Sequence, residues 1–259
     1  TQGRGGKGVI GLTTKEEDNV EHLFVANTHS YLLVFTDKGK VYRLRTHEIP
    51  AASRTARGVN IINLIQIESG EVVTAVLNIQ RFAEDRYLFM VTERGVVKKT
   101  ALSEFDTRRT GGLIAISLAD DAALRWVKVT DGNRHVVLAT HHGMSIRFSE
   151  EDVRAMGRPA AGVRGISLRT GDHVVGVALV RPDQDLLAVT ERGYGKRTPL
   201  TEYRVQNRGG IGIKTVQITE KNGPLVDCKT VDEKDEVLFI STGGQVIRSK
   251  VVEIRETGR

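Results

Sequence analysis

The chain has 259 residues, of which 39% are hydrophobic, 5% aromatic and 27% charged. This composition excludes an intrinsically disordered chain, which would carry too few apolar residues to bury a core. The 38 Lys and Arg against 32 Asp and Glu give a formal net charge of +6. Such an excess favours a polyanionic partner, with a basic protein that binds no nucleic acid as the plainer alternative. Neither a membrane span nor a signal peptide is expected, and the abrupt ends predict a piece of a longer protein.

Glycine turns recur along the chain from its first residues, and each is followed by a short run of strand-forming residues. The turns lie near Gly6, Gly58, Gly112, Gly162 and Gly210, at intervals of 52, 54, 50 and 48 residues. This regular interval identifies an internal repeat. We expect strands directly after the turns, at residues 9–10, 60–64, 113–116, 163–166 and 211–213, and a further strand beyond, as at 72–76 and 174–178.

A second motif alternates with these turns and has the form Ser/Thr-x-x-Gly-x-x-x-Arg/Lys. An apolar run precedes it, which predicts a strand buried on both faces. The glycine is third in a tight loop, where a hairpin needs a left-handed residue, and the returning strand carries the Arg or Lys. The motif occurs at Thr36-Gly39-Arg43, Thr92-Gly95-Lys99, Thr140-Gly143-Arg147, Thr190-Gly193-Arg197 and Ser241-Gly244-Arg248.

Together the two motifs predict four strands per repeat. Four-stranded units at intervals of about 50 residues are typical of an all-β fold of propeller-like blades. We expect one domain over residues 1–259 with five repeats, at about 1–53, 54–107, 108–157, 158–205 and 206–259. A short helical turn is expected at residues 149–152. The Trp-Asp dipeptides of WD40 propellers and the paired-glycine signature of kelch repeats are missing.

Cationic residues gather at the glycine turns and on the returning hairpin strands, one cluster per repeat. On the rim of a ring of blades they would form a belt that neutralises successive phosphates without reading sequence. Gly5, Gly6 and Gly8 either let the backbone approach phosphate or only permit a tight connection between blades. Aromatic residues that stack on bases are scarce, which favours duplex over single strands. The candidate binding residues are Gln2, Arg4, Gly5, Gly6, Lys7, Gly8, Arg43, Arg45, Arg54, Arg57, Lys98, Lys99, Arg108, Arg109, Arg147, Arg158, Arg164, Lys196, Arg197, Arg208, Lys214, Arg248 and Lys250.

The first glycine turn, Gln2-Gly3-Arg4-Gly5-Gly6-Lys7-Gly8, resembles the box Gln-Arg-Arg-Gly-Gly-Arg/Lys-Gly that marks the C-terminal domain of the A-type chain of DNA gyrase. Six of seven positions match, with Gly3 in place of an arginine, and residues 206–212 form a second near-copy. The run from Lys196 to Tyr203 and the other blade arms also resemble that family. The resemblance therefore covers essentially the whole chain.

This resemblance implies a β-pinwheel, usually of six blades, in which neighbouring blades exchange strands and duplex DNA wraps around the outer rim. Sequence before Thr1 and after Arg259 would complete the sixth blade. It also implies a non-catalytic domain, monomeric by itself, of a bacterial topoisomerase that supercoils DNA negatively in the cytoplasm, at the nucleoid. The partners would be the gyrase B subunit, in an A2B2 holoenzyme, and the rest of the gyrase A subunit. ATP and magnesium would bind outside this domain, which would hold no cofactor or metal and contact no membrane.

Two alternatives stay open. The degenerate turns at Arg57-Gly58, Thr110-Gly111-Gly112 and Ala161-Gly162 also suit the counterpart in topoisomerase IV, which shares the fold and would bind DNA without strong wrapping. A propeller that serves as a protein-interaction platform is the second alternative. A catalytic role has little support, because the tyrosines sit in strand contexts and the histidines lack metal-binding spacing. The single cysteine, Cys228, predicts a buried thiol in a reducing compartment.

Overall fold

A computed structural model describes residues 9–10, 25–52, 58–109, 111–241 and 245–259 of the chain. In these ranges the regular structure consists of β-strands and short 3-10 turns. None of the described helical turns is long and apolar enough to cross a membrane. The strands are β1 (Val9–Ile10), β2 (Tyr31–Thr36), β3 (Lys40–Arg45), β4 (Val73–Ile79), β5 (Tyr87–Thr92), β6 (Val96–Ala101), β7 (Leu113–Ile114), β8 (Leu124–Thr130), β9 (His135–Thr140), β10 (Met144–Ser149), β11 (Val163–Arg164), β12 (Val174–Val180), β13 (Asp185–Thr190), β14 (Gly195–Pro199), β15 (Ile213–Lys214), β16 (Leu225–Val231), β17 (Glu236–Ile240) and β18 (Gln245–Lys250). The 3-10 turns are η1 (Thr46–Glu48), η2 (Ile61–Asn63), η3 (Leu102–Phe105), η4 (Glu150–Asp152), η5 (Leu200–Glu202) and η6 (Val251–Glu253).

The strands form five antiparallel sheets, which we number as blades 1 to 5 by their central hairpins: β2–β3, β5–β6, β9–β10, β13–β14 and β17–β18. Blades 1, 2 and 3 have four strands, in the orders β4-β2-β3-β7, β11-β6-β5-β8 and β12-β9-β10-β15. Blades 4 and 5 have three described strands, β14-β13-β16 and β1-β18-β17. The all-β prediction is confirmed.

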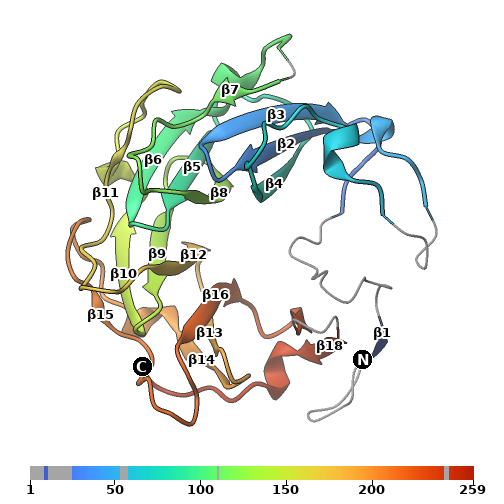
Figure 1. The fold of residues 1–259 in the computed structure, drawn as a ribbon. Coiled ribbons are helices and arrows are strands. Elements are labelled where there is room, and N and C mark those ends of the chain that lie inside the picture. The colour runs from blue at the N-terminus through green and yellow to red at the C-terminus, as the bar shows by residue number, and fades with distance from the viewer. Residues whose placement is uncertain (1–8, 11–24, 53–57, 110, 242–244) are drawn as a thin grey trace.

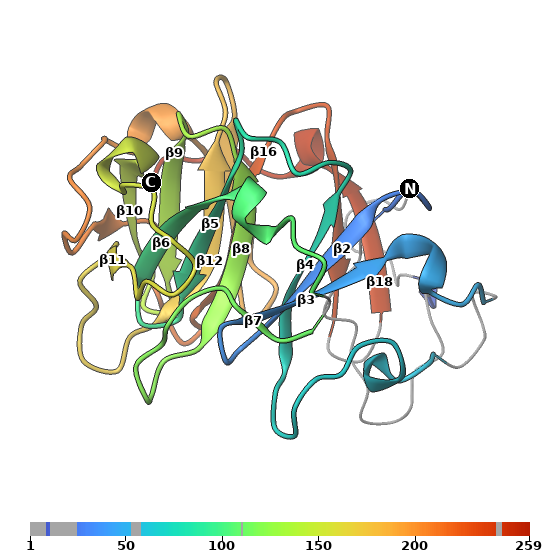
Figure 2. The same ribbon diagram turned by 90° about the horizontal axis from the view of Figure 1, so that it is seen from above.

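Neighbouring repeats exchange strands. The two-residue strands β7, β11 and β15 pair with β3, β6 and β10. Each therefore skips the hairpin that directly precedes it and completes the blade before that one, whose other strands come earlier in the chain. The blades surround a common centre, with β4, β8, β12 and β16 toward the middle and β7, β11 and β15 on the outside (Figure 1). Seen from its edge, the ring has strands that run across its thickness between two flat faces (Figure 2).

The hairpin motif has the geometry that its residues predict. Gly39, Gly95, Gly143 and Gly193 close the four described hairpin loops with φ between 72° and 79°, a region that glycine enters without steric cost. In blades 2, 3 and 4 the hydroxyl of the Thr that precedes the glycine hydrogen-bonds within the loop, as in blade 3, where Thr140 accepts the N–H of Met144 at 3.3 Å. The turn expected at 149–152 is confirmed as η4, where the Ser149 hydroxyl accepts the N–H of Glu151.

Apolar clusters fill the space between adjacent blades. Between blades 1 and 2, for example, Phe35 of β2 packs edge-to-face against Phe105 of η3, with ring centres 6.4 Å apart. Cys228 lies in the cluster between blades 3 and 4 and is 1% exposed, which confirms the buried thiol. Burial raises the pKa of this thiol well above its ordinary value, so it is a packed side chain and not a nucleophile.

Two predictions about strands are wrong in detail. The strand predicted at residues 60–64 is instead the turn η2, because the Asn60 side chain accepts the N–H of Ile62 and caps it. In the described part of the chain these residues have no returning hairpin strand beside them, unlike β7, β11 and β15. The first hairpin strand of blade 5, β17, is half-exposed instead of buried, with Leu238 47% exposed. Its sheet contains no described strand on that side.

Candidate nucleic-acid interface

In blades 1 to 4 the Arg or Lys of the hairpin motif connects its blade to the next one. Its side chain donates to a backbone carbonyl in, or directly after, the 3-10 turn of the following blade. Two of these carbonyls, those of Glu150 and Leu200, also accept a backbone N–H of their own turn, from Val153 and Tyr203. The pairs are Arg43 with Thr107 at 2.6 Å, Lys99 with Glu150 at 2.8 Å, Arg147 with Leu200 at 2.7 Å, and Arg197 with Ile254 at 2.9 Å. We call these four cations the latch residues.

The prediction that the hairpin cations form part of an exposed belt is wrong for three of them. Lys98 is 0% exposed, and Lys99 and Arg197 are each 6% exposed. Lys98 donates to the carbonyls of Ala115, at 2.7 Å, and Arg158, and burial lowers its pKa to about 8. A charged group is buried only where hydrogen bonds compensate its lost hydration, and here neighbouring segments offer such carbonyls.

The remaining hairpin cations vary in their surroundings. Arg43 is partly buried, lies over the rings of Tyr31 and Phe82, and pairs with Asp106 at 3.2 Å. Arg147 is half-buried, and the half-buried Lys196 donates to the carbonyl of Gly258 at 2.8 Å. The exposed hairpin cations are Arg45, Arg248 and Lys250, of which Arg248 pairs with Glu236.

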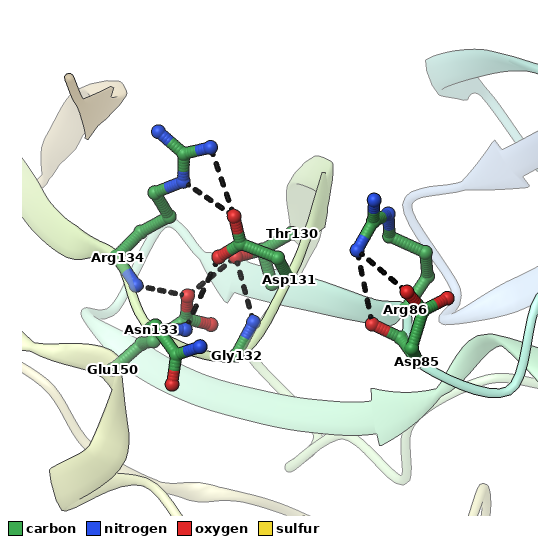
Figure 3. Close-up of polar contacts among 8 residues, drawn as sticks. All are labelled: Asp85, Arg86, Thr130, Asp131, Gly132, Asn133, Arg134 and Glu150. Atoms are coloured by element: carbon green, nitrogen blue, oxygen red, sulfur yellow. Dashed lines mark hydrogen bonds and ion pairs between the residues drawn. The ribbon is translucent and has the colours of Figure 1, made fainter.

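On the flat face that carries the 3-10 turns, two turns between blade strands pair an arginine with an aspartate of the same turn. Arg134 lies 2.8 Å from Asp131 in the turn between β8 and β9, and its hydrogen bond lowers the pKa of that carboxyl. The buried carboxylate of Glu150 accepts the N–H of Arg134 at 2.6 Å and the hydroxyl of Thr130 (Figure 3). In the preceding turn Arg86 pairs with Asp85 at 3.2 Å (Figure 3). These cations are neutralised within their own turns.

The glycine turns and the strands that follow them form the outer edge of the ring. We call residues 106–118, 153–168 and 203–218 the rim segments, of which residue 110 lies outside the described ranges; they contain β7, β11 and β15. Each is hydrogen-bonded to the next: the Ser117 hydroxyl donates to the carbonyl of Pro159 at 2.6 Å, and the Ser167 hydroxyl donates to that of Gly209 at 2.7 Å. The rim segments therefore form one continuous band around the outside of blades 1 to 3.

Glycines in the rim segments have a structural role. Gly162 and Gly212 have φ of 90° and 76°. A Cβ atom on Gly162 would lie 2.6 Å from the carbonyl oxygen of Val97, and one on Gly212 would lie 2.2 Å from that of Ser145. Both contacts are with the returning strand of the preceding blade, so these glycines permit the close connection between blades.

The rim segments carry cations with few acidic residues. Residues 153–168 contain Arg154, Arg158 and Arg164, and residues 203–218 contain Arg204, Arg208 and Lys214, with no Asp or Glu in either range. Residues 106–118 contain Arg108 and Arg109 and one acidic residue, Asp106. In the described part of the chain, no carboxylate oxygen lies within 4.0 Å of the side-chain nitrogens of these eight cations, although the backbone N–H of Arg158 donates to Glu104 at 3.2 Å. Six are exposed, and Arg158 and Arg208 are half-buried.

The sequence analysis does not include Arg154 and Arg204 among the candidate binding residues, nor Arg255 at the equivalent place after η6. All three are exposed and follow the apolar residue that ends a 3-10 turn. The sequence holds a signal for them, because each stands four residues before another arginine, at Arg158, Arg208 and Arg259. The predicted residues Gln2, Arg4, Gly5, Gly6, Lys7, Gly8, Arg54 and Arg57 lie outside the described residues.

Four-stranded blades that exchange strands around a ring define a β-pinwheel, here with a basic outer band. The family model described as DNA gyrase C-terminal domain, beta-propeller, matches residues 1–27, 30–80, 86–131, 134–181, 184–232 and 235–259. The chain therefore belongs to the DNA gyrase C-terminal domain family.

Individual relatives agree with this assignment. The A subunit of DNA gyrase from Haloquadratum walsbyi is 47% identical over 265 residues, which cover 100% of this chain and 31% of that protein. The chain thus spans about a third of that relative's length. A solved DNA gyrase A C-terminal domain gives a TM-score of 0.84 at 29% identity, covering 99% of this chain and 84% of that one. A solved C-terminal domain of DNA topoisomerase IV gives a TM-score of 0.80 at 30% identity, covering 90% of this chain and 73% of that one.

Proposed function

We propose that the chain binds duplex DNA along its rim segments and bends the duplex around the outside of the ring. The observation that carries this proposal is the pair of acid-free rim segments, 153–168 and 203–218, whose six cations have no carboxylate partner among the described residues. Unpaired cations on a surface favour a polyanion, because binding releases the counterions of its phosphates.

The architecture suits bending. Smooth bending of a 20–30 base-pair site costs on the order of 1–6 kcal/mol, so several contacts along the DNA must share it. The repeat supplies such contacts at regular intervals around a convex edge. The latch residues and the hydrogen bonds between rim segments hold these contacts in a fixed order.

In the longer protein, we propose that the chain presents wrapped DNA to the strand-passing part of a gyrase A subunit. That protein would act with the gyrase B subunit in an A2B2 holoenzyme, which uses ATP and magnesium outside this domain and supercoils DNA negatively. Work of this kind belongs to the bacterial cytoplasm, at the nucleoid. The likeness to a topoisomerase IV C-terminal domain supports an alternative, in which the rim binds DNA without wrapping it.

Mobility shifts of a duplex over a series of salt concentrations test the proposal. A rim variant would carry Arg154→Gln, Arg164→Gln, Arg204→Gln and Lys214→Gln. A matched control would lose four exposed cations outside the rim segments, by Arg181→Gln, Arg192→Gln, Lys221→Gln and Lys234→Gln. We expect affinity to fall steeply with salt and to be lost only in the rim variant. Equal losses in both variants would contradict a rim site, and the lack of any shift at low salt would favour the protein-interaction alternative.

A further inference from the structure

The tip of the blade 3 hairpin carries two histidines, which meet a third histidine at the start of β12. The ring of His141 stacks on that of His173, with ring centres 4.6 Å apart and planes inclined by 24°. The ring centre of His142 lies 5.7 Å from that of His141. The backbone joins the same two segments, because the N–H of His141 donates to the carbonyl of His173 at 2.9 Å. Three imidazoles therefore lie where the hairpin loop meets the segment before β12.

The other described blades show that this junction does not need histidine. In blades 1, 2 and 4 an acidic residue stands in the place of His141, and its N–H makes the same backbone bond to an apolar residue in the place of His173. These pairs are Asp37 with Val72 at 2.9 Å, Glu93 with Ala123 at 3.1 Å and Glu191 with Pro224 at 2.9 Å. Among the four described hairpin loops, blade 3 alone pairs two side chains that can both gain a positive charge.

The charged and titratable groups that face His141 come from three segments. His142 adjoins it in the same loop, His173 and Asp172 precede β12, and Glu191 stands in the hairpin loop of blade 4. The buried carboxylate of Asp172 already accepts the N–H of His142 at 3.0 Å and that of His173 at 2.9 Å. Burial and the imidazoles of His173 and His142 lower the pKa of His141 below its ordinary value of 6.5, and the two carboxylates oppose this shift without cancelling it. A proton on His141 is therefore unfavourable in the folded chain.

The same hairpin loop also holds blade 4. The carbonyl of His141 accepts the N–H of Leu225 at 3.1 Å, and Leu225 begins β16, the inner strand of that blade. The carbonyl of Gly143 accepts the N–H groups of Thr215 at 2.8 Å and Val216 at 3.2 Å, which belong to the rim segment 203–218. A displacement of loop residues 141–143 would therefore weaken the junction between blades 3 and 4.

We propose that the stacked rings of His141 and His173 form a pH-sensitive contact, which opens when both rings are protonated. Histidine gains its proton at mildly acidic pH, and two like charges on rings whose centres are 4.6 Å apart repel each other. The hairpin loop then moves away from His173, and its bonds to blade 4 weaken. Because the pKa of His141 is lowered in the folded chain, the unfolded chain binds more protons there. This part of the stability is complete above pH 6.5 and falls as the pH drops from there to the lowered pKa.

Amide hydrogen exchange of the whole chain, measured by nuclear magnetic resonance and corrected for the intrinsic pH dependence of exchange, tests this contact. Between about pH 7.5 and about pH 5.5 we expect the protection factors of the His141 and Leu225 amides to fall about 10-fold. The Glu93 amide makes the equivalent bond in blade 2, and its protection should stay constant. Added salt should reduce the fall, because it screens the repulsion between the rings.

Variants that copy the other blades identify the two rings as the source of the repulsion, with the Leu225 amide as the readout. His173→Ala, which copies Ala123 of blade 2, should abolish the fall, because it removes one of the two charges. His141→Glu, which copies blades 2 and 4, should also abolish it, because acidification then places a positive ring beside a carboxylate. His47→Gln, which removes an exposed histidine of η1, should leave the fall unchanged.

The inference is overturned if the His141 amide of the unaltered chain loses no more protection than the Glu93 amide does. It is also overturned if His173→Ala keeps the whole fall, or if His47→Gln abolishes it. All these measurements are made without DNA, so their outcome is independent of the proposed function.

Discussion

His135 and Arg147 stand twelve residues apart on the two strands of one hairpin, and Nδ1 of the imidazole accepts a hydrogen bond from Nη2 of the guanidinium at 3.0 Å. The same pairing of positions recurs in blades 1, 2 and 4. In blades 1 and 2 the latch residue lies over a tyrosine ring. Cζ of Arg43 is 4.1 Å from the ring centre of Tyr31, and Nζ of Lys99 is 5.4 Å from that of Tyr87. In blade 4 the equivalent contact is an ion pair, in which Nη1 of Arg197 lies 2.8 Å from Oδ2 of Asp185. The cation is a constant part of the connection between blades, and its partner varies.

Removing a latch should therefore destabilise the fold. Arg147→Met removes the guanidinium that donates to the carbonyls of Leu200 and Tyr203, and only Leu200 keeps another donor, the N–H of Tyr203. We expect the free energy of unfolding to fall by about 2–4 kcal/mol, measured by urea denaturation. Arg164→Met on the rim should change it by less than about 0.5 kcal/mol. Equal stability of the two variants would show that the latch contacts contribute nothing.

The hairpin glycines offer a matched pair for a second prediction. Gly143 and Gly193 both have positive φ, 79° and 77°. A Cβ on Gly143 would lie 2.3 Å from the carbonyl oxygen of Val216, whereas one on Gly193 meets no atom within 4 Å. Gly193→Ala should cost about 1–2 kcal/mol, from backbone strain alone.

Gly143→Ala should cost at least about 2 kcal/mol more than Gly193→Ala, because the backbone of the neighbouring segment must also move. Thermal unfolding of the two variants, followed by circular dichroism, measures the difference. If both lose the same stability, the close approach of the hairpin loop to Val216 is not a real constraint.

Lys98 makes stability depend on pH. Its pKa in the folded chain is lowered to about 8 from 10.5, so the unfolded chain binds more protons between these two values. Stability should therefore rise as the pH increases from about 8 to 10.5, by up to about 3 kcal/mol. Lys98→Met removes this rise, although it also leaves two carbonyls unpaired. The check is the difference in unfolding free energy between the two proteins at about pH 7.5 and about pH 10, and a constant difference would contradict the prediction.

Single rim cations should change the salt dependence of DNA binding. Each phosphate contact contributes about 0.9 to the slope of log affinity against log salt. Arg164→Gln and Lys214→Gln should each lower the magnitude of that slope by about 0.9. Arg192→Gln, in the hairpin loop of blade 4, should leave it unchanged. Slopes that are identical across the three variants would place the DNA elsewhere.

The sequence predicts the repeat, the hairpins and the blades because local chemistry determines them. Gly143 needs a left-handed conformation whatever surrounds it, and Thr140 braces its own loop. The burial of Lys99 could not be predicted in this way, because its acceptor is the carbonyl of Glu150, 51 residues away in the next blade. A cation on a strand looks the same in sequence whether it faces solvent or a neighbouring turn.

Two exposed arginines of the rim segments could have been predicted from the sequence. Arg154 and Arg204 precede Arg158 and Arg208 by four residues. This spacing is easily missed, because the two pairs stand at different distances from the glycines of their repeats, Gly162 and Gly210. Gln206 shows what the sequence does not reveal, since its side-chain nitrogen Nε2 is buried and has no hydrogen-bond partner among the described residues.

The wrapping of DNA around the rim is tested most directly by the linking number of a closed circle. The chain is bound to relaxed circular DNA, a type I topoisomerase relaxes the unbound part, and the linking number is measured after the protein is removed. We predict a positive shift that grows with the amount of protein and disappears in the variant without Arg154, Arg164, Arg204 and Lys214. An unchanged linking number with the unaltered chain, or an equal shift with the rim variant, would contradict the account.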